Sequence, residues 1–338
     1  MDEDDYPLDP ENYSYEYLPN ASSNVCEMGT YFVLHTHLTT VLYTLAFLLS
    51  LLGNSLVLCI LCRYENLTSL TNVFIVNLCA SDLVFSCMLP FWAVEQSFGW
   101  VFGEALCRLV SAVFSVGYYS GLFFLTLMTI LRYLSVVSPL STLRSPARCC
   151  GPLASLAVWA GSVLLVVPEV LHTAVQETLE GAKLCDYEDG RWKHVDVYLR
   201  NGLFLLSFGV IVFCYLRILL ILLGSRSRRR HRTVKLILII VAAFFLCWAP
   251  YNLLSFLLTL PPPSCRYARD SSLAFYISRK VAFSHCCLNP VLYVLVGVKF
   301  KRHLSRLCSR RPAPAPGQAP SPRLCSRGKF HHEDASIY

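Results

Sequence analysis

The sequence predicts an all-α integral membrane protein, a bundle of seven transmembrane helices followed by a short amphipathic helix. Two observations predict this fold class. Seven apolar stretches each reach the length of about 20 residues that a helix needs to cross a bilayer. Hydrophobic residues form 55% of the chain and charged residues only 15%, where a soluble domain carries about 25% charged residues. The predicted spans cover residues 38–62, 73–93, 105–130, 153–171, 197–223, 234–260 and 273–298.

The segments outside the spans are two tails and short loops, which leave no room for a soluble catalytic domain. Near the C-terminal end, Phe300, Leu304 and Leu307 recur at helical spacing between Lys and Arg, a pattern typical of a helix that lies on a membrane surface. Cys308 follows as a candidate palmitoylation site. The expected parts are an acidic tail (1–36), the bundle (37–298), the amphipathic helix (299–309) and a Pro-rich disordered tail (310–338).

The distribution of charge predicts the orientation. Residues 1–30 hold eight acidic residues and no Lys or Arg, whereas nine basic residues stand against two acidic ones from Lys299 onward. Lys and Arg accumulate on the cytoplasmic side of membrane proteins, so we expect the C-terminal tail inside and the N-terminal tail outside a multi-pass protein of the plasma membrane. Asn12 and Asn20 begin glycosylation sequons in that outer tail.

Four cysteines fall in segments predicted to be external, where disulfides can form. They are Cys26, Cys107, Cys185 and Cys265, and four cysteines allow three pairings. If Cys107 at the start of the third span pairs with Cys185 in the loop after the fourth, the bridge holds that loop over the mouth of the bundle. Cys26 and Cys265 would then form the second bridge.

Several polar residues lie inside the predicted spans, where they are costly unless they face the bundle interior and are therefore candidates for function. The alternative is that they only make packing hydrogen bonds. Pro290 in the seventh span and Pro250 in the sixth each free a backbone carbonyl and bend the helix, which favours hinges over a rigid channel wall. The polar residues are Asn54, Asp82, Arg132 and Asn289.

Together these residues resemble the motif set of rhodopsin-like G-protein-coupled receptors, and the match extends over residues 36–308. The tyrosine-bearing acidic tail, the extra Cys26 and Cys265, and the run from Ser284 to Cys287 resemble the chemokine receptor subfamily. Residues 124–144 and 228–236 are most similar to receptors for the XC class of chemokine. The motifs are Gly53 with Asn54, Leu78 with Asp82, Cys107 placed before Arg132 and Tyr133, Trp159, Cys247 to Pro250, and Asn289 to Tyr293.

The resemblance implies a small basic chemokine as ligand, with the acidic tail as the surface that captures it. Tyrosines beside Asp or Glu in that tail suit sulfation. Arg279 stands where many chemokine receptors have Glu, and a cation there would prefer a carboxylate on the ligand or on a neighbouring helix, for instance Glu95. The implied ligand-binding residues are Asp4, Asp5, Tyr6, Tyr13, Tyr15, Tyr17, Trp92, Glu95, Phe114, Tyr118, Glu169, Tyr251 and Arg279.

The resemblance also implies coupling to a heterotrimeric G protein of the inhibitory class, with calcium mobilisation and chemotaxis as outputs. Ligand would bias a bundle with two states and open a cavity for the G protein. Serines of the C-terminal tail are candidate phosphorylation sites for arrestin. We expect no cofactor and no nucleic acid. The implied switch and coupling residues are Asp82, Arg132, Tyr133, Tyr215, Trp248, Asn289, Pro290 and Tyr293.

The chain departs from the family pattern at identifiable positions. Leu131 stands where Asp usually precedes Arg132, so a local ion pair is missing. Ser207 replaces the usual proline of the fifth span, so that helix should be less bulged. Gly121 and His285 replace residues that often supply a hydroxyl and an amide to a sodium site near Asp82, which argues against sodium binding.

Three other functional hypotheses compete with the prediction of a signalling receptor. An atypical receptor that scavenges chemokine without coupling would also fit Leu131, although Arg132, Tyr133 and Tyr293 favour coupling. A transporter usually shows internal repeats, and the two halves of this chain do not resemble each other. Lys280 in the seventh span suggests a retinal-binding protein, which needs a lysine there to form a Schiff base. The residue at the matching opsin position, however, is Phe283. No cluster of nucleophile, base and orienting group supports an enzyme.

Overall fold

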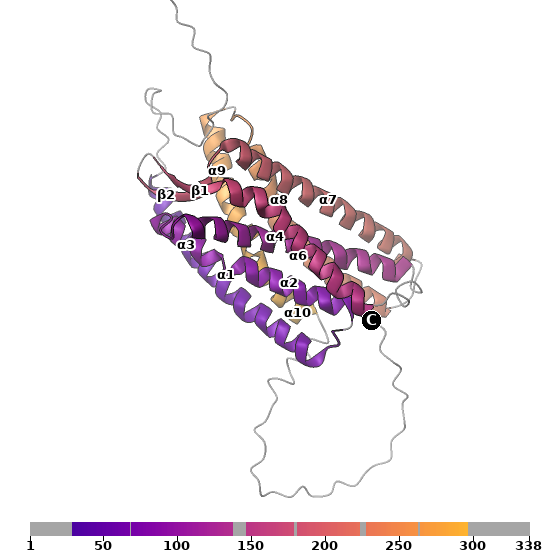
Figure 1. Ribbon diagram of the computed structural model, residues 1–338. Helices are drawn as coiled ribbons and strands as arrows, with labels where there is room; N and C mark the ends of the chain where they lie inside the picture. Colours follow the sequence, from indigo (N-terminus) through magenta and orange to yellow (C-terminus); the bar gives the residue numbers. More distant parts are fainter. Residues whose placement is uncertain are drawn as a thin grey trace, which may run out of the picture.

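The computed structural model describes residues 29–67, 69–137, 147–178, 181–223, 228–262 and 264–296. Long helices lie side by side, and a two-stranded hairpin covers one end of them (Figure 1). The acidic tail and the segment 299–309, predicted as an amphipathic helix, lie outside the described residues, as do the sequons and Cys308.

The seven predicted spans correspond to helices in the same order, so the predicted seven-helix bundle is confirmed. The second span is divided into α2 and α3, and the seventh into α9, η1 and α10. The elements are α1 (Gly29–Tyr64), α2 (Leu70–Ser86), α3 (Leu89–Phe98), α4 (Glu104–Val137), α6 (Ala147–His172), β1 (Thr173–Glu177), β2 (Lys183–Tyr187), α7 (Gly190–Leu223), α8 (Arg228–Leu257), α9 (Cys265–Phe283), the 3-10 helix η1 (Ser284–Cys287) and α10 (Leu288–Val296).

Within the described residues, six helical stretches are long and apolar enough to cross a membrane by themselves, and α2 with α3 counts as one of them. The seventh does not qualify by hydropathy, because five of the 19 residues of α9 are charged and the helix changes type at η1. Breaks in the second and seventh spans both lie near a proline. Pro90 occupies the first turn of α3, where its missing N–H costs no hydrogen bond.

Helix α4 forms the centre of the bundle, since it contacts α2, α6, α7, α8 and both strands. Its buried residues include Tyr118, Leu122 and Leu125, none of which is exposed. By contrast Leu52 of α1 and Leu164 of α6 are 70% and 71% exposed. Exposed leucines on membrane-length helices suit contact with lipid, in which the backbone of each helix must satisfy its own hydrogen bonds.

The hairpin β1–β2 is antiparallel, with Val175 opposite Cys185. A disulfide joins Cys185 to Cys107 of α4, and the main-chain N–H of Trp100 donates to the carbonyl of Lys183 at 2.6 Å. Gly99 has a φ of 72°, and a Cβ there would lie 2.9 Å from the same carbonyl. A conformation that L residues rarely adopt and a close approach both require glycine at this position.

Gly117 lies where α4 packs tightly against α2, and this packing generates a stability prediction. A Cβ at this residue would lie 2.8 Å from the backbone nitrogen of Phe85 and 2.9 Å from its Cα, atoms that move only with α2. Overpacking of this kind costs about 1–3 kcal/mol. Gly117→Ala should therefore lower the thermal unfolding midpoint of the detergent-solubilised protein.

Gly121 on the same helix supplies the matched control. A Cβ there would meet its nearest neighbours at 3.9 and 4.0 Å, which is ordinary contact, so Gly121→Ala should leave the midpoint nearly unchanged. Equal midpoints for the two variants would contradict the packing described for α2 and α4.

Candidate functional site

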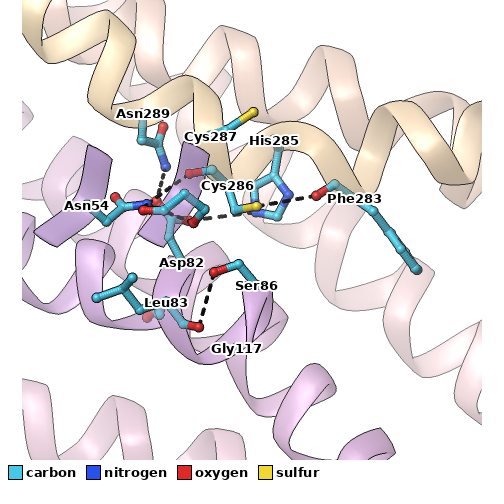
Figure 2. Close-up of polar contacts among 12 residues, drawn as sticks. Asn54, Asp82, Leu83, Ser86, Gly117, Phe283, His285, Cys286, Cys287 and Asn289 are labelled. Atoms are coloured by element: carbon cyan, nitrogen blue, oxygen red, sulfur yellow. Dashed lines mark hydrogen bonds and ion pairs between the residues drawn. The ribbon is translucent and has the colours of Figure 1, made fainter. Parts of the chain in front are cut away.

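A buried polar group connects the seventh span to α1 and α2, as Figure 2 shows. Nδ2 of Asn289 donates to Oδ2 of Asp82 at 2.7 Å, and Nδ2 of Asn54 donates to the carbonyl of Cys286 at 3.0 Å. Asn54, Asp82 and Asn289 are each at most 3% exposed. Three of the four polar residues predicted inside the spans thus belong to one buried polar group that three helical segments share, whereas Arg132 lies elsewhere on α4.

Pro290 explains why the carbonyl of Cys286 needs a donor from another helix. In a regular helix the N–H of residue 290 would donate to that carbonyl, and proline has none. Asn54 supplies the missing hydrogen bond. Gly53 allows this arrangement, because a Cβ there would lie 2.7 Å from Cβ of Pro290.

Four consecutive side chains account for the 3-10 geometry of η1. Ser284, His285, Cys286 and Cys287 each bond to the carbonyl three residues earlier, at 2.8, 2.7, 3.4 and 2.8 Å. Short polar side chains that bond to nearby carbonyls compete with the regular helical pattern. A carbonyl only accepts, so Nδ1 of His285 carries the proton and Nε2 is left facing Asp82.

The donors around Asp82 do not fit the sodium site that the resemblance to rhodopsin-like receptors implies. One carboxylate oxygen accepts from Asn289, and Oδ1 faces Nε2 of His285 at 3.8 Å. Gly121 offers no side-chain oxygen. Hard cations take oxygen ligands, and here a ring nitrogen stands in place of an amide oxygen. The absence of sodium binding stays a prediction.

The predicted pocket residues form one aromatic group next to this polar group. Tyr118 and Trp248 have ring centroids 4.4 Å apart, Trp248 and Tyr251 5.5 Å, and Trp92 and Phe114 5.9 Å. The ring of Trp248 lies 5.2 Å from that of His285. Contacts between rings thus run from the hairpin end of the bundle to the residue that faces Asp82.

Two phenylalanines belong to this group although the sequence analysis did not assign either of them to the pocket. Phe85 and Phe283 have ring centroids 4.3 and 4.7 Å from that of Phe114. Their signal in the sequence is weak, because phenylalanine in an apolar span is ordinary core composition. Only the topology shows that α2, α4 and α9 bring these rings together.

Arg279 has a different partner from the one suggested. Its Nη2 donates to Oε1 of Gln96 at 3.2 Å, and its guanidinium lies 6.0 Å from the ring centroid of Phe283. Oε1 of Glu95 instead accepts from the main-chain N–H of Cys185 at 2.7 Å and interacts with Arg279 only at longer range. Glu95 therefore anchors the hairpin, and the direct contact of Arg279 is neutral.

Of the two predicted disulfides, the one between Cys107 and Cys185 is present. Cys26 lies outside the described residues, and so does the side chain of Cys265, which begins α9. The second bridge stays a prediction. The tail residues Asp4, Asp5, Tyr6, Tyr13, Tyr15 and Tyr17 and the sequons at Asn12 and Asn20 are likewise outside the described residues.

A charged pair on α7 was not predicted from the sequence. Nη2 of Arg200 donates to Oδ2 of Asp196 at 2.9 Å, with side chains 9% and 16% exposed. Glu169 of α6 interacts electrostatically with both. Opposite charges four residues apart stabilise a helix, and their position at the start of a membrane-length helix was the signal available in the sequence.

At the far end of α4, Arg132 is 8% exposed and its Nε atom has no hydrogen-bond partner among the described residues. Tyr133 and Tyr215 pack against one small apolar cluster of α4, α7 and α8. Leu131 packs against the main core and offers Arg132 no carboxylate. Tyr293 lies in α10, and its side chain is outside the described residues.

Comparison with known proteins agrees with this architecture. The profile of the 7 transmembrane receptor (rhodopsin family) matches residues 53–293. Chemokine XC receptor 1 of Homo sapiens is 50% identical, over 97% of this chain and 98% of that protein. The Mus musculus protein of the same name is 47% identical over 94% and 96%. CX3C chemokine receptor 1 of Mus musculus is 36% identical over 89% and 85%.

The donor set around Asp82 predicts insensitivity to sodium. Replacing NaCl by choline chloride at constant ionic strength should leave the thermal midpoint of the purified protein unchanged, because Gly121 and His285 supply neither the hydroxyl nor the amide that the family's sodium site implies. The double variant Gly121→Ser, His285→Asn restores a hydroxyl and an amide, and it should gain a sodium-dependent rise in the midpoint. A sodium-specific rise in the unmodified protein would contradict our interpretation of the site.

Proposed function

Because this chain belongs to the rhodopsin family of seven-transmembrane receptors, and within it to the chemokine receptors, we propose that it binds a chemokine of the XC class and activates a heterotrimeric G protein of the inhibitory class. The observation that carries the proposal is the 50% identity to chemokine XC receptor 1 of Homo sapiens over nearly the whole of both chains. Calcium mobilisation and chemotaxis are the expected outputs. A receptor of this family is not an enzyme.

The proposed location is the plasma membrane, with the N-terminal tail outside the cell. The charge of the N-terminal tail supports this orientation, since residues 1–30 carry eight acidic side chains and no Lys or Arg. The disulfide between Cys107 and Cys185 agrees with it, because disulfides persist in oxidising compartments. Both observations support the proposal that the hairpin end of the bundle faces the outside of the cell.

Ligand recognition is proposed to occur in two steps. The acidic tail first attracts the basic chemokine, which raises the rate of association more than the final affinity. The aromatic group around Trp92, Phe114, Tyr118 and Tyr251 then receives the part of the ligand that enters the bundle. Arg279 adds a positive charge beside this aromatic group, at a position where many chemokine receptors have Glu.

Signalling is proposed to pass from Trp248 to the polar group and on to the end of α4. Trp248 touches His285, which faces Asp82, and Asp82 holds Asn289 next to Pro290. A ligand that prefers one arrangement of these residues shifts the populations of the two states. Arg132, Tyr133, Tyr215 and Tyr293 would then meet the G protein, and arrestin would bind the phosphorylated C-terminal tail.

The direct experiment applies purified chemokines of each class to cells that express the chain, and it records calcium and cyclic AMP. A response to the XC class alone is expected, and pertussis toxin should abolish it because the toxin uncouples inhibitory G proteins. Mock-transfected cells are the control. A response to another class, or none to any, would contradict the proposal.

Leu131 predicts raised basal activity. Without Asp beside it, Arg132 lacks the ion pair that would hold the resting state. Leu131→Asp should therefore lower ligand-free G-protein activation, measured as nucleotide exchange at equal surface expression, with Leu131→Asn as the uncharged control. Equal ligand-free signalling in the parent and Leu131→Asp proteins would remove this explanation.

A further inference from the structure

Two cysteines near the end of α1 lie on the face of that helix that is turned away from the bundle. Cys59 and Cys62 are both free and exposed. They continue a stripe of exposed residues that includes Leu52 and Leu56, which are 70% and 37% exposed, because residues three or four apart share one face of a helix. The neighbouring Ile60 is 0% exposed, so the core of the bundle lies on the other face.

Packing does not account for these two cysteines. Free cysteine is among the most buried residue types, and in a core it behaves as a small hydrophobic side chain. Other cysteines of this chain follow that rule and lie buried inside the bundle. Cys59 and Cys62 fill no space in the core, and their thiols are available to the surroundings of α1. The buried cysteines are Cys79, Cys214, Cys247 and Cys286.

Arg63 fixes the depth of these thiols in the membrane. It is exposed in the last turn of α1, and long basic side chains near helix ends place their charge at the membrane interface. The membrane-length stretch Thr36–Tyr64 has 29 residues. At about 1.5 Å per residue it is longer than the hydrocarbon core of about 30 Å, so its end reaches the headgroups. Along the helix axis, Cys62 lies about 1.5 Å and Cys59 about 6 Å from Arg63.

In the orientation proposed above, this end of α1 faces the cytoplasm, where thiols stay reduced. Exposed cysteines beside the membrane interface are the substrates of reversible S-acylation. We propose that Cys62, with Cys59 one turn away, forms an S-acylation site for a long-chain fatty acyl group. This site is separate from Cys308, and the inference rests on the proposed orientation and not on the proposed ligand.

The acyl donor is a fatty acyl-coenzyme A, and a membrane acyltransferase of the cell catalyses the transfer. The cysteine sulfur attacks the thioester carbonyl and forms a new sulfur–acyl bond. The bond from the acyl carbon to the coenzyme sulfur breaks, and the proton of the cysteine passes to the coenzyme A thiolate. No oxidation or reduction takes place.

The exposed stripe of α1 provides a surface for the attached chain. Half of the hydrocarbon core is about 15 Å, which corresponds to about ten residues of helix. An acyl chain that starts at Cys62 and runs toward the middle of the bilayer therefore reaches the level of Leu52. It lies along Leu56 and Leu52, on the face of α1 that the bundle leaves exposed.

The test counts thioesters on the full-length chain made in mammalian cells. Free thiols are blocked, hydroxylamine then cleaves the thioesters, and a maleimide–polyethylene glycol adds one mass tag to each thiol released. Cys308→Ser is the background, because it removes the acylation site expected from the sequence. In this background the chain should still carry a hydroxylamine-dependent tag. Adding Cys59→Ala and Cys62→Ala should remove at least one tag at equal surface expression.

Cys87→Ala is the matched control. Cys87 is also free and exposed, but it follows the 17 residues of α2. It therefore lies about 25 Å from the start of α2 at Leu70, far from the cytoplasmic interface. Cys87→Ala should keep every tag of the background, because depth and not exposure alone selects the acylated thiols.

Two results of the tag count would overturn the site. One is an equal number of tags with and without Cys59 and Cys62, and the other is a loss of the same size in Cys87→Ala. A reversed orientation would overturn it as well and is recognised separately, because an antibody against an epitope fused to the N-terminus would then stain only permeabilised cells. A chain that responds to no chemokine but loses the tag as described would contradict the proposed function and leave this site in place.

Discussion

The hydrogen bond from Asn54 to the carbonyl of Cys286 is the interaction on which the seventh span depends. Pro290 removes the main-chain donor for that carbonyl, and lipid offers no water to replace it. A carbonyl left without a donor costs about 1–3 kcal/mol. Asn54 can reach it only because Gly53 lets Pro290 lie against α1. A proline, a glycine and an asparagine from two distant spans therefore form a single structural unit.

This unit lies next to the residues through which we propose that the receptor signals. The bond from Asn289 to Asp82 lies just beyond it, and the side-chain bonds of η1 replace part of the regular helical pattern. A helix held by side chains from other helices can be rearranged at lower cost than one held by its own backbone. We therefore propose that the contacts that compensate for Pro290 also let the seventh span respond to changes at Trp248.

The membrane spans and the polar contacts between them could be predicted from the sequence, for physical reasons. Apolar length predicts the spans, and polar residues inside them predict which faces meet, because Asn54, Asp82 and Asn289 are costly in a span unless they face the bundle interior. The break between α2 and α3 and the partner of Arg279 were not predicted. Gln96 and Glu95 are adjacent and both polar, and only the hairpin geometry decides that Glu95 accepts from Cys185. The Asp196–Arg200 pair was missed because it lies at the start of a span, where charges are ordinary.

A double-mutant cycle on Asn54 and Pro290 tests the central claim most directly. Asn54→Ala should lower the thermal midpoint of the purified receptor, since the carbonyl of Cys286 loses its donor. In a Pro290→Ala background the main-chain N–H of residue 290 can supply that donor, so the same change should cost clearly less. The bonds from Asn54 to Ser50 are lost in both backgrounds and cancel in the comparison. Equal losses in the two backgrounds would show no coupling and would contradict the account.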